Sequence, residues 1–279
     1  MSDRDVKAAV REHYASVARG ESACCGTATK LSGGCCGATP APDRLSKAIG
    51  YSEAEVQAVP DGSNLGLGCG NPLAHAALKE GDVVVDLGSG AGFDCFLAAR
   101  RIGPGGRVIG VDMTPDMLDR ARSNAAADGY ANVEFRLGEI ENLPVADASA
   151  DMVISNCVIN LSGDKPRVFR EALRVLKPGG RLMVSDLVLA RPLPESVARS
   201  VAAYAGCIAG AMLKDEYLGT IRGAGFVDVE VLAESTYPVG SSNPDATERA
   251  IVDDPNISAD DLRAAANAVV SIKVGARRP

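Results

Sequence analysis

The chain has 279 residues, 46% of them hydrophobic, and a formal net charge of −7. A chain of this size can bury a large core without disulfide or metal staples. The negative charge and the absence of clustered Lys and Arg argue against a nucleic-acid partner. The sequence contains no apolar run of about 18 residues, so we expect no membrane span. The charged start, MSDRDVKAAVREHY, is unlike a signal peptide, so we expect a cytoplasmic protein.

Several elements are predicted before residue 81. Residues 3–18 carry apolar side chains at helical spacing, which predicts an amphipathic helix. Residues 20–44 are rich in Gly, Ser, Thr, Ala and Pro and predict a loop. Ser52 followed by Glu55 is a capping-box pattern and predicts a short helix at 53–59. The stretch 62–72, GSNLGLGCGNP, has too many glycines for a regular element.

From Gly81 onward, apolar strands alternate with helices. We expect strands at 82–87, 107–112, 132–138, 150–155 and 181–190, and helices at 91–102, 114–129 and 165–180. Further on we expect helices near 195–212, 214–223 and 259–268, and strands near 226–235 and 268–275. Unbroken β-branched strands separated by helices predict a doubly wound, mostly parallel α/β sheet that is covered on both faces. We divide the chain into an N-terminal helix and cysteine-rich loop (1–70), an α/β domain (71–190) and a smaller C-terminal α+β region (191–279).

The first strand–helix junction reads VVVDLGSGAGFD. Glycines at 88, 90 and 92 allow a tight turn and close approach to a ligand, which the following helix N-terminus then faces. Asp112 stands twenty residues after Gly92, where an acid accepts hydrogen bonds from ribose hydroxyls in nucleotide-binding sheets. A glycine turn used only for packing would leave Asp112 unexplained, so the pattern indicates a nucleotide site.

Three motifs carry a family resemblance over residues 82–190. The stretches DLGSGAG, RLGEIENLP and LKPGGRL resemble those of class I S-adenosylmethionine-dependent methyltransferases, with a Rossmann-like fold. In this resemblance Asp112 would hold the ribose. The residues implied near the adenine are Met113, Met117, Glu139 and Ile140. The loop of Gly88, Ser89 and Gly90 would take the methionyl end, and Asp86 and Asn156 are also expected to bind the cofactor.

Eight cysteines form two doublets and four single positions. In a reducing compartment such residues are buried hydrophobes, metal ligands or redox groups. Cys157 follows a strand whose carboxyl end should face the cofactor, and we expect Cys69 and Cys207 to converge on it. Thiolates select soft centres, and trivalent arsenic takes three sulfurs while keeping a lone pair that can attack a sulfonium methyl group. Burial as a small hydrophobe is the competing interpretation, and we prefer it for Cys95.

The segments LGLGCGNP, DLGSGAGFDCFLAAR, GVDMTPDML, SNCVINL and GCIAGA closely resemble bacterial arsenite methyltransferases. This resemblance implies that Cys69, Cys157 and Cys207 hold arsenic(III) and that S-adenosylmethionine is the methyl donor. It also implies arsenite or its thiol conjugates as substrate, thioredoxin or glutathione as the source of reduced thiols, and an upstream redox cysteine, which is Cys35 or Cys36. We expect a monomer.

Two other functions fit parts of the pattern. One is a methyltransferase acting on carbon or oxygen of a quinone-like acceptor, which would want a base rather than three thiols. The other is a metalloid-binding protein without turnover, which could dispense with Asp112 and the glycine turn. For the doublets Cys24-Cys25 and Cys35-Cys36, arsenic capture, redox chemistry and a tail without function stay open. Structural zinc fits their adjacency poorly.

Overall fold

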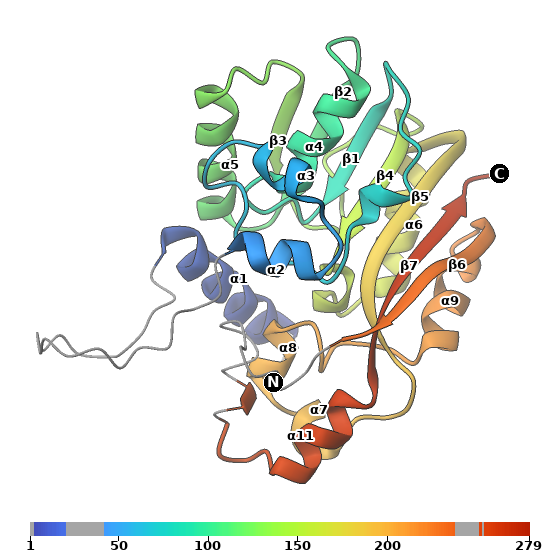
Figure 1. The fold of residues 1–279 in the computed structure, drawn as a ribbon. Coiled ribbons are helices and arrows are strands. Elements are labelled where there is room, and N and C mark those ends of the chain that lie inside the picture. Colours follow the sequence, from blue (N-terminus) through green and yellow to red (C-terminus); the bar gives the residue numbers. More distant parts are fainter. Residues whose placement is uncertain (1–2, 21–41, 238–250, 253) are drawn as a thin grey trace, which may run out of the picture.

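The computed structural model describes residues 3–20, 42–237, 251–252 and 254–279. In this part of the chain, seven strands form one sheet in the order β3-β2-β1-β4-β5-β7-β6 (Figure 1). The strands are β1 (Val83–Leu87), β2 (Arg107–Asp112), β3 (Val133–Leu137), β4 (Ala150–Asn156), β5 (Leu176–Leu189), β6 (Val227–Thr236) and β7 (Val269–Arg277). β1 to β5 pair in parallel, whereas β7 is antiparallel to both of its neighbours. The expected doubly wound, mostly parallel sheet is confirmed.

The helices surround this sheet on both faces and at one end. They are α1 (Asp3–Arg19), α2 (Pro42–Ala48), α3 (Glu53–Gln57), α4 (Phe93–Ile102), α5 (Pro115–Ala127), α6 (Lys165–Val175), α7 (Glu195–Ala198), α8 (Val201–Ala205), α9 (Lys214–Gly223) and α11 (Ala259–Ala266), with short 3₁₀ turns η1 (Pro72–Ala74) and η2 (Ile159–Leu161). The capping box is confirmed, because Ser52 and Glu55 exchange both expected hydrogen bonds at the start of α3.

Side chains alternate between the two faces of the central strands. Val85 and Leu87 of β1 pack with the apolar stripes of α6 and α9 on one face. Val84 of β1 packs with α4 and α5 on the other. Asp86 shares the second face with Val84, because side chains two residues apart in a strand point the same way. The strand therefore places one buried acid under the helix that follows the glycine turn.

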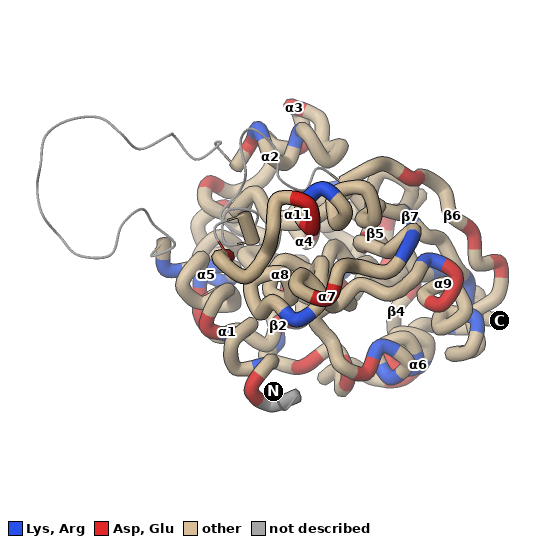
Figure 2. The backbone as a smooth tube through the Cα atoms, turned by 90° about the horizontal axis from the view of Figure 1, so that it is seen from below, with Lys and Arg blue, Asp and Glu red and all other residues tan. Residues whose placement is uncertain are grey.

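A third cluster lies beyond the carboxyl ends of the parallel strands. It joins residues of α1, α7, α8 and α11 to the ends of β5 and β7, and it includes Cys69 and Cys207. Figure 1 shows α1, α2 and α8 at this end of the sheet, and the view from below shows α1 beside α5 and α8 (Figure 2). These elements cover the edge at which open α/β sheets bind ligands.

The predicted helix 165–180 is wrong at its C-terminal end. α6 stops at Val175, and Leu176 is extended with ψ 143°. Pro178 disfavours the helical conformation of the residue before it. The freed segment pairs with neighbouring backbone instead, since the Gly179 N–H donates to the carbonyl of Arg278 at 3.0 Å. Residues 176–180 consequently begin β5.

The single helix predicted near 195–212 is also wrong. The structure has two short helices, α7 and α8, and residues 206–213 are not helical. The backbone of this stretch pairs with the end of β5, where the Leu189 N–H donates to the carbonyl of Met212 at 2.8 Å. Gly210 also approaches the backbone so closely that a Cβ there would lie 2.1 Å from the carbonyl oxygen of Asn160. Tertiary contacts thus override the helix propensity of an alanine-rich sequence.

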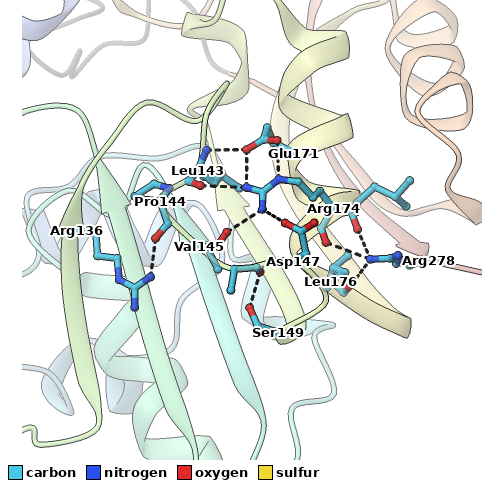
Figure 3. A network of polar contacts seen from close by, with 12 residues as sticks. Arg136, Leu143, Pro144, Val145, Asp147, Ser149, Glu171, Arg174, Leu176 and Arg278 are labelled. Carbon is cyan, nitrogen blue, oxygen red and sulfur yellow. Dashed lines mark hydrogen bonds and ion pairs between the residues drawn. The ribbon is translucent and has the colours of Figure 1, made fainter.

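One arginine fixes the loop between β3 and β4, as Figure 3 shows. The guanidinium of Arg174 donates to the carbonyls of Leu143 (3.0 Å) and Val145 (2.8 Å) and pairs with Glu171 at 2.7 Å. Glu171 in turn accepts from the Leu143 N–H at 2.8 Å. This network ties the loop to α6 and so holds the preceding residues, 138–141, at the ligand-binding edge.

The last two strands extend the same sheet. β7 pairs with β5 along its whole length and β6 pairs with β7, although a helix, α11, precedes β7 in the chain. The division of the chain at residues 70 and 190 stays a prediction. No helix in the described part of the chain has both the length and the hydrophobicity needed to cross a bilayer.

Candidate functional site

One pocket occupies the carboxyl edge of β1, β2 and β4. Its walls come from the glycine turn, the β2 end, the 63–68 loop, α1 and the segments that carry Cys157 and Cys207. This edge is the topological switch point, since β1 lies between β2 and β4 while the chain continues in opposite directions from it. The two halves of the predicted site therefore face one cavity.

The glycine turn follows β1 closely. Gly88 has φ +68°, and a Cβ at this position would lie 2.4 Å from the Val158 side chain. Only glycine fits there, for both conformational and steric reasons. The hydroxyl of Ser89 is buried and has no hydrogen-bond partner among the described residues, although Ser89 lines the pocket. A buried polar group of this kind is expected to meet a ligand.

Asp112 connects the end of β2 to the glycine turn. Its carboxylate accepts from the Gly90 N–H at 2.9 Å and from the Thr114 N–H at 2.8 Å. Desolvation raises the pKa of Asp112, and these N–H donors oppose the rise. Thr114 is the N-cap residue of α5, but its side chain does not cap the helix. Met113 and Met117 line the same pocket.

The loop after β3 meets helix α1. Ile140 and Glu141 line the pocket, whereas Glu139 points to α1 and pairs with Lys7 at 2.9 Å. Lys7 also pairs with Glu141 at 3.0 Å. These contacts place α1 over the pocket, and Lys7 is the only Lys or Arg among the described residues that line it.

Four acidic side chains line the pocket and give it a negative character. They are Asp86, Asp94, Asp112 and Glu141, of which Glu141 is paired with Lys7. Burial, followed by repulsion from Asp94, raises the pKa of Asp86 well above its usual range. Burial also raises the pKa of Asp94 to about 6, although the hydroxyl of Tyr51 donates to this carboxylate at 2.7 Å. The Cys95 thiol donates to Asp86 at 3.2 Å from a fully buried position, which confirms that Cys95 belongs to the core. A cationic ligand would suit this pocket.

The structure brings the three predicted thiols together. Cys69 comes from the loop before η1, Cys157 from the end of β4, and Cys207 from the segment after α8. The sulfurs of Cys69 and Cys157 lie within 4.8 Å of each other and of a carboxylate oxygen of Asp186. The thiol of Cys207 donates to the carbonyl of Cys157, with 2.7 Å between sulfur and oxygen. No disulfide joins these residues, which are all free.

Burial and mutual contacts favour the protonated forms of Cys69 and Cys157. Hydrogen bonds with the thiols of Cys207 and Cys69, reinforced by burial, raise the pKa of Cys157 well above its usual range. Burial raises the pKa of Cys69, and a hydrogen bond with Cys157 opposes the rise. Without a ligand, several thiolates in one small space would repel each other. A multiply charged soft cation that binds all of them removes that repulsion.

Asn156 anchors the Cys69 loop to the end of β4. Its side-chain oxygen accepts from the Cys69 N–H at 3.1 Å, and its side-chain nitrogen donates to the carbonyl of Gly70 at 2.8 Å. The same nitrogen lies 2.9 Å from the Tyr51 hydroxyl. Ser271 of β7 completes the anchor by donating to the Cys69 carbonyl at 2.6 Å. The side-chain amide of Asn156 therefore positions the loop that carries the Cys69 thiol, and Asn156 also lines the pocket.

Lys7, Tyr14 and Asp94 line the pocket and Asp186 lies beside the thiols, although no sequence motif marks them. The pattern around Lys7 and Tyr14 indicates only an amphipathic helix, and Asp94 and Asp186 stand in a helix and a strand whose patterns indicate packing. A polar residue in an apolar strand, as at Asp186, was the one available signal. Cys35 and Cys36 lie outside the described residues.

Comparisons with known proteins agree with this geometry. Residues 78–225 match a family model for a methyltransferase domain. The chain is 49% identical, over 83% of its length, to an arsenite methyltransferase of Halobacterium salinarum, and it covers 60% of that protein. It is 40% identical, over 75% of its length, to an arsenite methyltransferase of Aquipseudomonas alcaligenes, and again covers 60% of it. The chain thus spans about three fifths of the length of these curated relatives.

A solved structure is also similar. An arsenic(III) S-adenosylmethionine methyltransferase from Chlamydomonas reinhardtii superposes with a TM-score of 0.62 at 34% sequence identity. The match covers 86% of this chain and 74% of the algal one. Both the sequence and the fold therefore point to one family.

Proposed function

Because this chain belongs to the methyltransferase domain family, and within it to the arsenite methyltransferases, we propose that it transfers a methyl group from S-adenosylmethionine to trivalent arsenic. Cys69, Cys157 and Cys207 would hold the arsenic. One observation carries the proposal: three thiols from separate segments meet beside the pocket that also contains the glycine turn and Asp112.

The pocket residues suit the methyl donor. Asp112 would accept hydrogen bonds from the ribose, and Met113, Met117 and Ile140 would surround the adenine. The negative carboxylates suit the cationic methionyl end, and the unpartnered Ser89 hydroxyl offers it a hydrogen bond. When bound, the donor supplies a sulfonium methyl group. The protein needs no base for the attack, because arsenic brings its own lone pair.

The thiols suit the acceptor. Arsenite, As(OH)₃, exchanges its three hydroxyls for three thiols and releases three waters, so each thiol proton leaves with a hydroxyl. Protonated cysteines are therefore competent to bind it. The three sulfurs then fix the direction of the lone pair. Alignment of two bound reactants can lower a barrier by roughly 7–11 kcal/mol.

The proposal includes a thiol reductant. Methyl transfer leaves arsenic formally oxidised by two electrons, and two thiolates can return it to the trivalent state by forming a disulfide. Cys35 or Cys36 would take part in this step, and thioredoxin or glutathione would restore the thiols. We place the reaction in the cytoplasm, where such thiols are kept reduced, and expect a monomer.

The decisive experiment is an assay of the purified protein with arsenite, S-adenosylmethionine and a thiol reductant, with the products separated by arsenic speciation. We expect methylated arsenicals from the wild type. Cys157→Ser should abolish methylation while binding of the donor, measured by calorimetry, stays within about twofold. A wild type that methylates a quinol but not arsenite, or a Cys157→Ser variant with full activity, would overturn the proposal.

The reductant step has its own test. Serine replacements of Cys35 and Cys36 should slow repeated turnover more than the first methylation, because the first round needs no reduction. Serine replacements of Cys24 and Cys25 form the matched comparison. Equal losses in the first and later rounds would remove these cysteines from the redox step.

A further inference from the structure

A buried carboxylate lies next to two of the thiols. Asp186 lies on β5 and is fully buried, and one of its carboxylate oxygens is within 4.8 Å of the sulfurs of both Cys69 and Cys157. Arsenic bound by three thiols does not need this acid as a ligand, so the proposed binding site does not explain why the acid is there. An acid in an apolar strand interior is costly unless something compensates for its burial.

Three donors hold the Asp186 carboxylate in place. The Asn160 side-chain nitrogen donates to one oxygen at 3.0 Å, and the Leu187 N–H donates to the same oxygen at 2.9 Å. The Tyr217 hydroxyl donates to the other oxygen at 2.9 Å. Hydrogen bonds of this kind favour the ionised form and fix its orientation. The carboxylate is thus preorganised next to two of the thiols.

The charge of Asp186 is not paired by a base. Burial raises the pKa of Asp186 to about 7, and the hydrogen bonds from Tyr217 and the Leu187 N–H, together with the attraction of Lys165, oppose this rise. The structure gives this acid no ion pair among the described residues. The ammonium of Lys165 donates instead to the carbonyls of Ser162 (3.0 Å) and Asn160 (3.5 Å). A carboxyl that ionises near neutral pH, and that has no ion pair of its own among the described residues, therefore lies next to two of the thiols.

The proposed reaction moves a positive charge toward this acid. Arsenic bound by three thiolates is neutral, and the sulfonium donor carries one positive charge. The arsenic lone pair forms the As–C bond, the S–C bond breaks, and its electron pair remains on the donor sulfur as a neutral thioether. Arsenic is formally oxidised from +3 to +5, and the positive charge now resides on the methylated arsenic and its sulfur ligands.

We propose that Asp186 stabilises the positive charge that develops on arsenic and its thiolates during methyl transfer. The inference rests on the proposed function. Asp186 does not contact the reacting atoms and acts through the sulfurs. Its carboxylate is held in place next to the region where positive charge develops in the transition state. For charges roughly 6 Å apart in a site of effective dielectric constant about 20, partial charge transfer predicts a rate effect of about tenfold or more.

The test separates methyl transfer from binding. Asp186→Asn should lower the single-turnover rate of arsenite methylation about 10- to 100-fold at saturating arsenite and donor. The dissociation constants should stay within about threefold, measured by equilibrium dialysis for arsenite and by calorimetry for S-adenosylmethionine. Asp151→Asn is a matched control, since this acid lies at the other end of the neighbouring strand β4 and pairs with Lys177. Its rate should equal that of the wild type.

A second pair of variants guards against misfolding. In Asp186→Asn the new amide nitrogen can face the Tyr217 hydroxyl donor, and Tyr217→Phe removes this conflict. The ratio of rates between Tyr217→Phe and the double variant Tyr217→Phe/Asp186→Asn should again be about tenfold or more. An unchanged ratio, or a rate loss matched by an equal loss of arsenite affinity, would overturn the inference. A wild type that does not methylate arsenite would instead overturn the proposed function.

Discussion

The sulfur of Cys207 lies 2.7 Å from the carbonyl oxygen of Cys157, and both residues have left-handed backbones, with φ of +61° and +56°. This conformation is uncommon for residues other than glycine and costs about 1–2 kcal/mol per residue. The surrounding structure sustains it, since the Cys157 N–H donates to the Ser185 carbonyl at 2.8 Å. Two strained residues in contact thus present two thiols to one site, as is common where geometry serves function.

This strain predicts an inverted order of stability at position 207. Cys207→Ala and Cys207→Gly both lose the thiol, but only glycine adopts the left-handed conformation without a penalty. We expect the glycine variant to be more stable than the alanine variant by about 1 kcal/mol, measured by urea unfolding, whereas glycine is normally the less stable of the two. An alanine variant of equal or greater stability would show that the backbone is not strained.

The anchor of the Cys69 loop gives a second prediction. Asn156→Ala removes the partners of the Cys69 N–H and of the Gly70 carbonyl, and each buried group left unpaired costs about 1–3 kcal/mol. The loop should shift, so arsenite affinity should fall at least tenfold while donor affinity falls less. Equilibrium dialysis measures the arsenite affinity, and calorimetry measures the donor affinity. Tyr51→Phe removes only one neighbouring hydroxyl and should have a smaller effect on arsenite binding; a larger effect would contradict the anchor.

The sequence sufficed for those parts of the site that follow from local periodicity. Asp112 and Cys157 could be placed because Asp112 ends one strand and Cys157 follows another, and the carboxyl ends of parallel strands meet at one edge. Nothing local indicates that Cys207 is left-handed, or that the segment after α8 leaves the helix to pair with Leu189. Those features depend on contacts between residues far apart in the chain.

Long-range pairing also shapes the loop after β3. The structure pairs Glu139 with Lys7, which lies 132 residues earlier in the chain, and the place of Glu139 near the adenine stays a prediction. Asp186 looked like an ordinary member of a buried strand, because its partners Asn160 and Tyr217 come from separate elements. Polar side chains that satisfy each other across the fold leave no spacing pattern in the sequence.

The carboxylate of Asp112 predicts a loss of donor affinity on truncation. Asp112→Ala would remove the acceptor proposed for the ribose and release the N–H groups of Gly90 and Thr114. Hydrogen bonds to charged groups are worth about 1.5–3 kcal/mol, so affinity for S-adenosylmethionine should fall roughly 10- to 100-fold by calorimetry. Arsenite affinity should stay near that of the wild type. Unchanged donor affinity would mean that the ribose is held elsewhere.

Helix α1 should contribute to donor affinity through Lys7. This lysine pairs with Glu139 and Glu141, and its side chain is only 20% exposed. Partly buried pairs are worth more than exposed ones, so Lys7→Met should weaken donor binding about fivefold and reduce its dependence on salt. Arg11→Met is the matched control on the same helix, because Arg11 reaches Glu139 only at 3.8 Å and is 47% exposed. Equal effects of the two variants would contradict a specific role for Lys7.

The acids of the pocket predict how donor binding depends on pH. Burial raises the pKa of Asp94 to about 6 in the free protein, so the carboxyl is protonated at pH 5 and ionised at pH 7.5. A cationic donor favours the ionised form, and its affinity should therefore rise as the pH passes through about 6, by about five- to tenfold in total. For the free protein the sign is opposite: the folded state binds more protons than the unfolded state between pH about 4 and 6, so the contribution of Asp94 to stability is lost as the pH rises through this window.

Calorimetry with S-adenosylmethionine from pH 5 to 7.5 tests this dependence. Asp94→Asn should bind the donor more weakly at pH 7.5 and show a flatter profile, because the titrating charge is gone. The remaining side-chain oxygen can still accept a hydrogen bond from one of the two present donors, Tyr51 or Asn156. Proton release, measured in buffers of different ionisation enthalpy, should accompany binding to the wild type near pH 6 and diminish in the variant. If the wild-type affinity is constant across this range, the Asp94 carboxylate does not face the positive charge of the donor. Its role would then be to hold Tyr51 through their hydrogen bond.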